Sequence, residues 1–162
     1  MWSCNRRNFL ISAVALAGCG YTPVYGPDGV GRSLQGKIAF DTPETPDTYA
    51  LVRYLEERMG RTDAATYGLS YSLNVREEGL AVTASQVIAR QNMLGKMSFS
   101  LRDLSDNSVV TSGKVSGMTG YSTTGSTVST RAAQNDAYER LMVILGDRMI
   151  NQLLLTFPEG AS

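Results

Sequence analysis

The sequence predicts an α+β domain in which two helices pack on one face of a sheet. Apolar and polar residues alternate along most of the segment from residue 67 to residue 118, which is the pattern of half-buried strands. Two segments, 46–59 and 129–155, instead carry apolar residues at helical spacing. The predicted order is strand, helix, four-strand meander and helix, and such an order places helices against one side of an antiparallel sheet.

The first strand and helix are predicted from residues 34 to 60. Residues 34–40 place Leu34, Ile38 and Phe40 on one face, which predicts a short strand. Thr45 is a suitable helix cap and Pro46 suits the first helical position, so a helix is expected from there to about residue 59.

The meander is predicted from four alternating runs joined by short turns. A turn is expected at Glu77-Glu78-Gly79 and another at residues 105–108. The predicted strands are residues 67–76, 80–89, 93–102 and 109–118. One face of the sheet is then polar, and it carries Ser70, Ser72, Asn74, Arg76, Lys96, Ser98, Ser100 and Arg102. This face is either an ordinary solvated surface or one that meets a polar partner.

The predicted domain ends in a long helix that follows a polar loop. Residues 118–130 are rich in Gly, Ser and Thr, so we expect a loop or a fraying strand extension there. The helix is expected from about residue 129 to residue 155, with Asp136 and Arg140 paired across one turn.

The first residues have the three-part plan of a secretory signal. Arg6 and Arg7 precede an apolar run, residues 9–17, that is less than half of the about 20 residues a membrane span needs. Leu16-Ala17-Gly18-Cys19 resembles the lipobox of bacterial lipoproteins, which implies a mature N-terminus at Cys19 that carries lipid. The paired arginines also resemble a twin-arginine signal; that route and the general secretory route both lead to the periplasm.

These signals divide the chain into a leader, a tether, one domain and a short tail. The mature protein of 144 residues is long enough for one domain, and residues 20–33 read as an aperiodic tether. The predicted parts are a signal peptide at 1–18, a lipidated tether at 19–33, an α+β domain at 34–157 and a tail at 158–162.

Composition argues against catalysis and against nucleic acid as a partner. The chain contains no histidine, which removes the usual general base and the commonest zinc ligand, so we expect no enzyme activity, no metal and no cofactor. Cys4 leaves with the leader and Cys19 carries lipid, so no disulfide is expected. The mature charge of about −2 lacks the basic excess that nucleic acid requires.

Three stretches together resemble the LPS-assembly lipoprotein LptE family in its alphaproteobacterial form. They are Leu-Ala-Gly-Cys-Gly-Tyr-Thr-Pro-Val-Tyr-Gly at 16–26, Ala-Arg-Gln-Asn-Met-Leu-Gly-Lys-Met-Ser-Phe-Ser-Leu-Arg-Asp at 89–103 and Ala-Gln-Asn-Asp-Ala-Tyr-Glu-Arg-Leu at 133–141. The resemblance implies an outer-membrane lipoprotein on the periplasmic face. Such a protein plugs the β-barrel LPS translocon LptD, helps it assemble, and assists insertion of lipopolysaccharide at the cell surface.

Contact with lipopolysaccharide phosphates would require Lys or Arg, and the candidates in the meander are Arg76, Arg90, Lys96 and Arg102. Of these, Arg90 and Lys96 are singled out because they flank one predicted connection and could act together. Solvated surface cations are the alternative interpretation. A second class of function also stays open, namely a periplasmic adaptor or ligand-binding lipoprotein with another partner.

Overall fold

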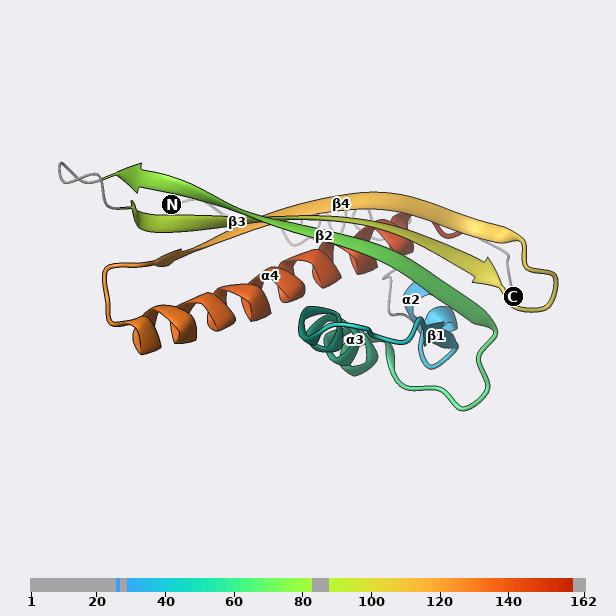
Figure 1. The fold of residues 1–162 in the computed structure, drawn as a ribbon. Coiled ribbons are helices and arrows are strands. Elements are labelled where there is room, and N and C mark those ends of the chain that lie inside the picture. The colour runs from blue at the N-terminus through green and yellow to red at the C-terminus, as the bar shows by residue number, and fades with distance from the viewer. Residues whose placement is uncertain (1–25, 27–28, 83–87, 159–162) are drawn as a thin grey trace, which may run out of the picture.

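The computed structural model describes residues 26, 29–82 and 88–158, and the side chains of 80–89 lie outside that description. Its elements confirm the α+β class: a four-stranded mixed sheet lies on one side of the molecule, and helices α3 (Pro46–Met59) and α4 (Thr127–Thr156) lie on the other (Figure 1). None of the described helices is both long enough and apolar enough to span a membrane.

Three long strands form most of the sheet. They are β2 (Tyr67–Val82), β3 (Ile88–Asp103) and β4 (Val109–Ser122), joined antiparallel in the order β2-β3-β4. The turn predicted at residues 77–79 is wrong, because Glu77 pairs with Met93 and Glu78 with Asn92 in an unbroken ladder. The predicted four-strand meander is therefore a three-strand meander. The chain passes from β2 to β3 through residues 83–87, which the structure does not describe.

The segment before the meander also differs from the prediction. Leu34 closes a five-residue helix, α2 (Val30–Leu34), in which it is fully buried, so the expected strand from residue 34 is wrong at its start. Gly36, at a φ of 69°, then turns the chain in a conformation that favours glycine. The strand itself, β1 (Ile38–Phe40), pairs in parallel with residues 67–69 of β2.

Helix α3 has the termini that its sequence predicts. The Thr45 side chain accepts a hydrogen bond from the Thr48 backbone amide, and the Thr48 hydroxyl in turn accepts one from the Thr45 amide. This reciprocal cap satisfies two of the amides that a helix start leaves unpaired. The helix ends at Gly60, and its buried residues are Leu51, Val52, Leu55 and Met59.

Helix α4 lies close to the sheet because glycines face it. Its 30 residues span about 45 Å and cross β3 and β4 (Figure 1). Gly95 and Gly117 are register partners beneath it. A Cβ on Gly95 would lie 2.8 Å from Leu145 Cδ1 and 3.1 Å from Leu141 Cδ2, so a side chain there would collide with the helix.

The two long helices also contact each other. Gly146 of α4 lets the Tyr54 ring of α3 approach, since a Cβ at residue 146 would lie 2.7 Å from the ring. The Tyr54 hydroxyl donates to Asp147 Oδ1 at 2.6 Å. Burial raises the pKa of the Tyr54 phenol, and the bond to Asp147 raises it further, to about 12. With both helices on one side, no described helix covers the opposite face of the sheet, which is called the open face below.

Candidate functional site: the open face of the sheet

The open face is defined by strand register. Ser72 of β2, Ser98 of β3 and Lys114 of β4 form one cross-strand row, and Asn74, Lys96 and Ser116 form the next. Side chains alternate between the faces of a sheet, so these rows lie opposite the buried Met97 and Phe99. The predicted polar face is confirmed, with Ser112, Lys114 and Ser116 of β4 added to it.

Two adjoining hollows lie over the middle of this face. One encloses about 440 Å³ above the serines of the three strands, at positions 70, 72, 98, 100 and 112. The other encloses about 400 Å³, and Lys96 and Lys114 both line it. Ser72, Ser98 and Lys114 line both hollows, so together the hollows form one shallow trough whose open-face side chains are Ser, Asn and Lys.

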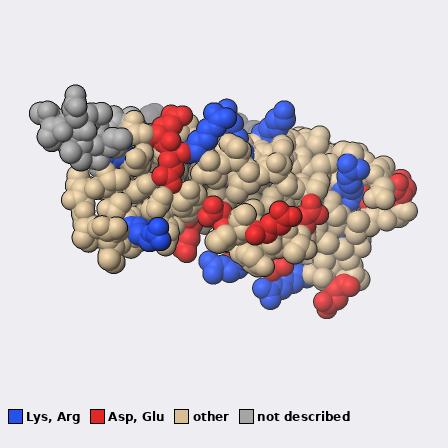
Figure 2. All heavy atoms as spheres, viewed as in Figure 1, with Lys and Arg blue, Asp and Glu red and all other residues tan. Residues whose placement is uncertain are grey.

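The charged side chains of the open face are mostly cations. The exposed cationic side chains of this face are Arg76, Arg90, Lys96, Arg102 and Lys114. None of the five forms an ion pair with another residue in the described part of the chain. Figure 2 shows basic side chains projecting along the upper edge of the molecule, the side on which Figure 1 places the sheet. The trough is therefore suited to polar or anionic groups.

The structure places the two predicted contact residues on one strand. Arg90 and Lys96 share the open face of β3, six residues and about 20 Å apart. The reasoning that paired them across a connection is wrong, because that connection does not exist. Arg90 lies toward the far end of the sheet, level with Ser122, whereas Lys96 lies at the trough.

Lys114 is the trough residue that sequence reasoning missed. It pairs with Ser98, one row from Lys96, and it lines both hollows. Polar and apolar residues alternate around Lys114 in β4, which is the signal that could have placed it on the polar face. The start of β4 was predicted correctly, but the register that brings Lys114 next to Lys96 includes a shift between Leu101 and Arg102 that the sequence does not indicate.

Glu77 has a structural role on the helix side of the sheet. Its carboxylate accepts hydrogen bonds from Tyr121 Oη at 2.9 Å, Gln134 Nε2 at 2.8 Å and Tyr138 Oη at 3.0 Å. Partial desolvation raises the pKa of this carboxyl, but the three hydrogen bonds outweigh it and the pKa is lowered from 4.5. The ionised carboxylate thus ties the first part of α4 to β2 and β4.

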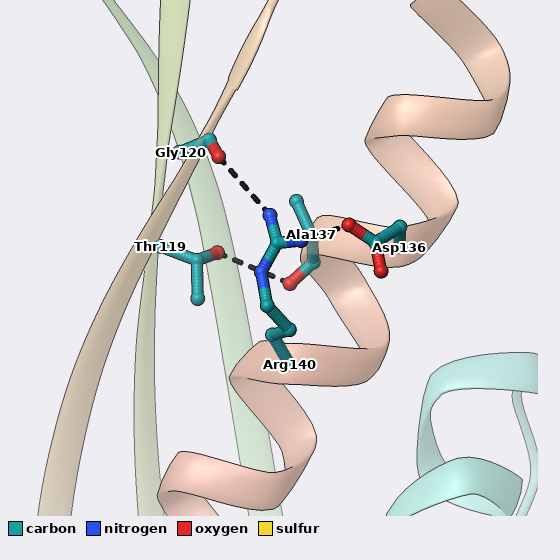
Figure 3. Close-up of polar contacts among 5 residues, drawn as sticks. All are labelled: Thr119, Gly120, Asp136, Ala137 and Arg140. Carbon is teal, nitrogen blue, oxygen red and sulfur yellow. Dashed lines mark hydrogen bonds and ion pairs between the residues drawn. The ribbon is translucent and has the colours of Figure 1, made fainter.

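Helix α4 also covers backbone groups along the outer edge of β4. The Arg140 guanidinium donates to the Gly120 carbonyl at 3.2 Å while it pairs with Asp136, and Thr119 Oγ1 donates to the Ala137 carbonyl at 3.1 Å (Figure 3). About two helical turns further along α4, the Arg148 guanidinium donates to the Ser116 carbonyl. Edge carbonyls engaged in this way are not available to another strand.

No cluster of three or more Cys, Asp or Glu suited to a metal ion occurs within residues 29–82 and 88–158. Cys19 lies outside the described residues, and its lipidation stays a prediction.

Solved structures share this architecture. A candidate lipoprotein from Caulobacter crescentus has a TM-score of 0.65 at 21% identity, over 78% of this chain and 94% of that one. Rare lipoprotein B from Shewanella oneidensis has a TM-score of 0.57 at 10% identity, over 74% and 93%. A minor lipoprotein from Acinetobacter baumannii has a TM-score of 0.55 at 16% identity, over 78% and 97%. These TM-scores establish a shared fold, and the three structures are named as those of bacterial lipoproteins.

Comparison with family models found no match, and comparison with curated proteins found none either.

Proposed function

We propose that this chain is a lipid-anchored outer-membrane protein that occupies the lumen of the LPS translocon barrel LptD. In that position it helps the barrel assemble and assists lipopolysaccharide insertion at the cell surface. The observation that carries the proposal is the open sheet face, because the lumen of a large outer-membrane barrel is polar and filled with water. A trough of serines and cations suits that lumen better than an apolar surface would.

The N-terminus supports the location. Acyl chains on Cys19 would hold the domain at the periplasmic face of the outer membrane, since two or more chains give stable anchoring. The three lipoprotein structures that share the fold are consistent with such an anchor.

Lipopolysaccharide phosphates are the ligand groups that best fit the trough. Lys96 and Lys114 lie in neighbouring rows and line the same hollow, so both ammonium groups can approach one anionic headgroup. Arg90 would contact a different part of the ligand or the barrel, because it lies about 20 Å along the strand. The role is one of binding and positioning, and no catalytic step is proposed.

Affinity isolation from detergent-solubilised outer membranes tests the proposal. We expect the lipidated protein to co-purify with a large outer-membrane β-barrel, and its depletion to reduce surface lipopolysaccharide. Isolation of a different partner, with normal surface lipopolysaccharide after depletion, would favour the adaptor alternative.

A charge variant tests the trough separately. Lys96→Gln with Lys114→Gln should lower lipopolysaccharide binding at low salt without unfolding the domain. Arg53→Gln with Arg131→Gln, at two exposed helix positions, is the matched control and should bind like the wild type. Equal losses in both variants would show that overall charge, rather than the trough, governs binding.

A further inference from the structure

Beyond residue 69, the outer edge of β2 has no neighbouring strand in the part of the chain that the structure describes. β1 lies beside β2 over residues 67–69 alone, and β3 occupies the other side of β2 along its whole length. From Tyr71 onward, no strand among the described residues pairs with this edge. Figure 1 shows β1 beside the beginning of β2, with the rest of the long strand running past it.

The backbone groups of this edge point outward at alternate residues. The Tyr67 amide donates to the Lys37 carbonyl at 3.0 Å, and the Leu69 carbonyl accepts from the Asp41 amide at 3.0 Å. Because the amide and carbonyl directions alternate along a strand, the amides and carbonyls of Tyr71, Leu73 and Val75 point to the same side. A strand that continued the line of β1 would find these groups ready to pair.

The opposite edge of the sheet provides a contrast. On β4, two guanidiniums of α4 engage the carbonyls of Ser116 and Gly120, so that edge is protected. No described side chain makes such a bond to the outward carbonyls of residues 71, 73 and 75. Proteins usually block strand edges that must not pair with another strand. The β4 edge is blocked in this way and the β2 edge is not, so the β2 edge can accept an added strand.

A hollow lies in line with β1, at the point where the chain turns away from β2. It encloses about 490 Å³ between the segment that joins β1 to α3 and the edge residues Tyr71, Ser72 and Leu73. Asp41 and Glu44 line it, both exposed and neither in an ion pair within the described residues. Figure 2 shows acidic side chains gathered near the middle of this side of the molecule, where Figure 1 places α3.

The side chains of the edge residues set the chemistry of the occupant. Leu73 and Val75 are half-buried and pack at the margin of the core, so an added strand would cover apolar surface on its helix side. The two carboxylates of the hollow call for a cation. A second copy of this chain would bring its own Asp41 and Glu44 to the same interface, so a partner strand that is more basic than β2 fits this edge better.

We propose that the β2 edge from Tyr71 to Glu77 accepts an extended strand from a partner protein. The strand carries Lys or Arg where it passes Asp41 and Glu44, and apolar residues where it covers Leu73 and Val75. This inference goes beyond the proposed function and does not depend on it, because it rests on the outward backbone groups of β2, whereas the trough is formed by side chains of the open face; Ser72 borders both.

A synthetic peptide tests the edge directly. The probe is an end-blocked nine-residue peptide that alternates Thr and Val and carries Lys at both ends; its control carries Glu at both ends. With the full mature chain in detergent, we expect hydrogen exchange at residues 71–77 to slow when the Lys peptide is present. We also expect the Lys peptide to bind at least tenfold more tightly than the Glu peptide at low salt, about the difference that 1.4 kcal/mol produces.

Two pairs of variants locate the contact. Asp41→Asn with Glu44→Gln should remove most of the preference for the Lys peptide, whereas Glu57→Gln with Asp63→Asn should preserve it. Val75→Pro removes one outward amide and should weaken binding at least tenfold, whereas Val75→Thr keeps the amide and should not. Circular dichroism of each variant confirms that the sheet is intact before binding is compared.

Three outcomes would overturn the proposal. They are unchanged exchange at residues 71–77, equal binding of the two peptides, and concentration-dependent protection of this edge without peptide. The last outcome, with a dimer mass in light scattering, would assign the edge to a second copy.

Discussion

The close approach of α4 to the sheet makes a specific prediction about the pair Gly95 and Leu141. Leu141 is fully buried, and truncation of such a leucine to alanine costs about 2 to 5 kcal/mol of unfolding free energy. Gly95→Ala alone should cost about 1 to 3 kcal/mol, because the new Cβ would lie 3.1 Å from Leu141 Cδ2 and 2.8 Å from Leu145 Cδ1.

The double variant should lose less stability than the sum of the two single variants. With Leu141 truncated, the Leu145 side chain can move into the vacated space and leave room for the new methyl group. We expect a coupling of at least about 1 kcal/mol, within the range for residues in contact.

Unfolding in guanidinium chloride, followed by circular dichroism, measures the unfolding free energies for this double-mutant cycle. The four proteins are the parent, Gly95→Ala, Leu141→Ala and the double variant, all in a lipid-free Cys19→Ala background. Additive losses to within about 0.5 kcal/mol, or a Leu141→Ala loss below that value, would refute the packing argument.

Three further predictions follow from the anchor, the Glu77 cluster and the β4 edge. Cys19→Ala should leave the protein uncleaved or soluble, and an unmodified Cys19 in mature wild-type peptide by mass spectrometry would contradict the lipid anchor. Glu77→Gln should destabilise the domain at pH 7 by at most about 1 kcal/mol because the carboxylate is exposed. Because the pKa of Glu77 is lowered in the folded state, its stabilisation is present above the unfolded-state pKa and is lost as pH falls through the folded-state pKa. The unfolding free energies of wild type and Glu77→Gln should therefore converge at acid pH. A difference in unfolding free energy that persists at acid pH would contradict this role of Glu77. Arg140→Gln with Arg148→Gln should uncover the β4 edge and produce concentration-dependent association in analytical ultracentrifugation, and a monomer at all concentrations would show that the guanidiniums do not protect it.

The strands were predictable where apolar and polar residues alternate strictly and where the residues that determine the structure are close in sequence. The faces of β2 and β3 follow directly from that alternation, and Thr45 and Gly60 mark the ends of α3. The Glu-Glu-Gly stretch at 77–79 misled the prediction because its composition is typical of turns. The structure holds it extended through pairing with β3 and hydrogen bonds from β4 and α4, which are distant in sequence.

The candidate site was predictable as a polar face and less so as a set of residues. Which cations gather in the trough depends on register across three strands, and register depends on contacts that no single segment encodes. Lys114 was missed for this reason, whereas Arg90 was paired with Lys96 because a connection was predicted within what is one continuous strand, β3. Helix α2 has only five residues, and it forms where Leu34 is buried in the core, so its local sequence carries no helical signal.

Site-specific photo-cross-linking in living cells tests the proposal that the open sheet face meets the LptD barrel. A photoreactive residue at Ser98 lies in the trough, and one at the exposed Glu139 of α4 lies on the helix side. We expect a covalent adduct between the Ser98 position and LptD that is absent from strains without lipid attachment at Cys19. An adduct with another protein at Ser98, or LptD adducts at Glu139 with none at Ser98, would contradict it.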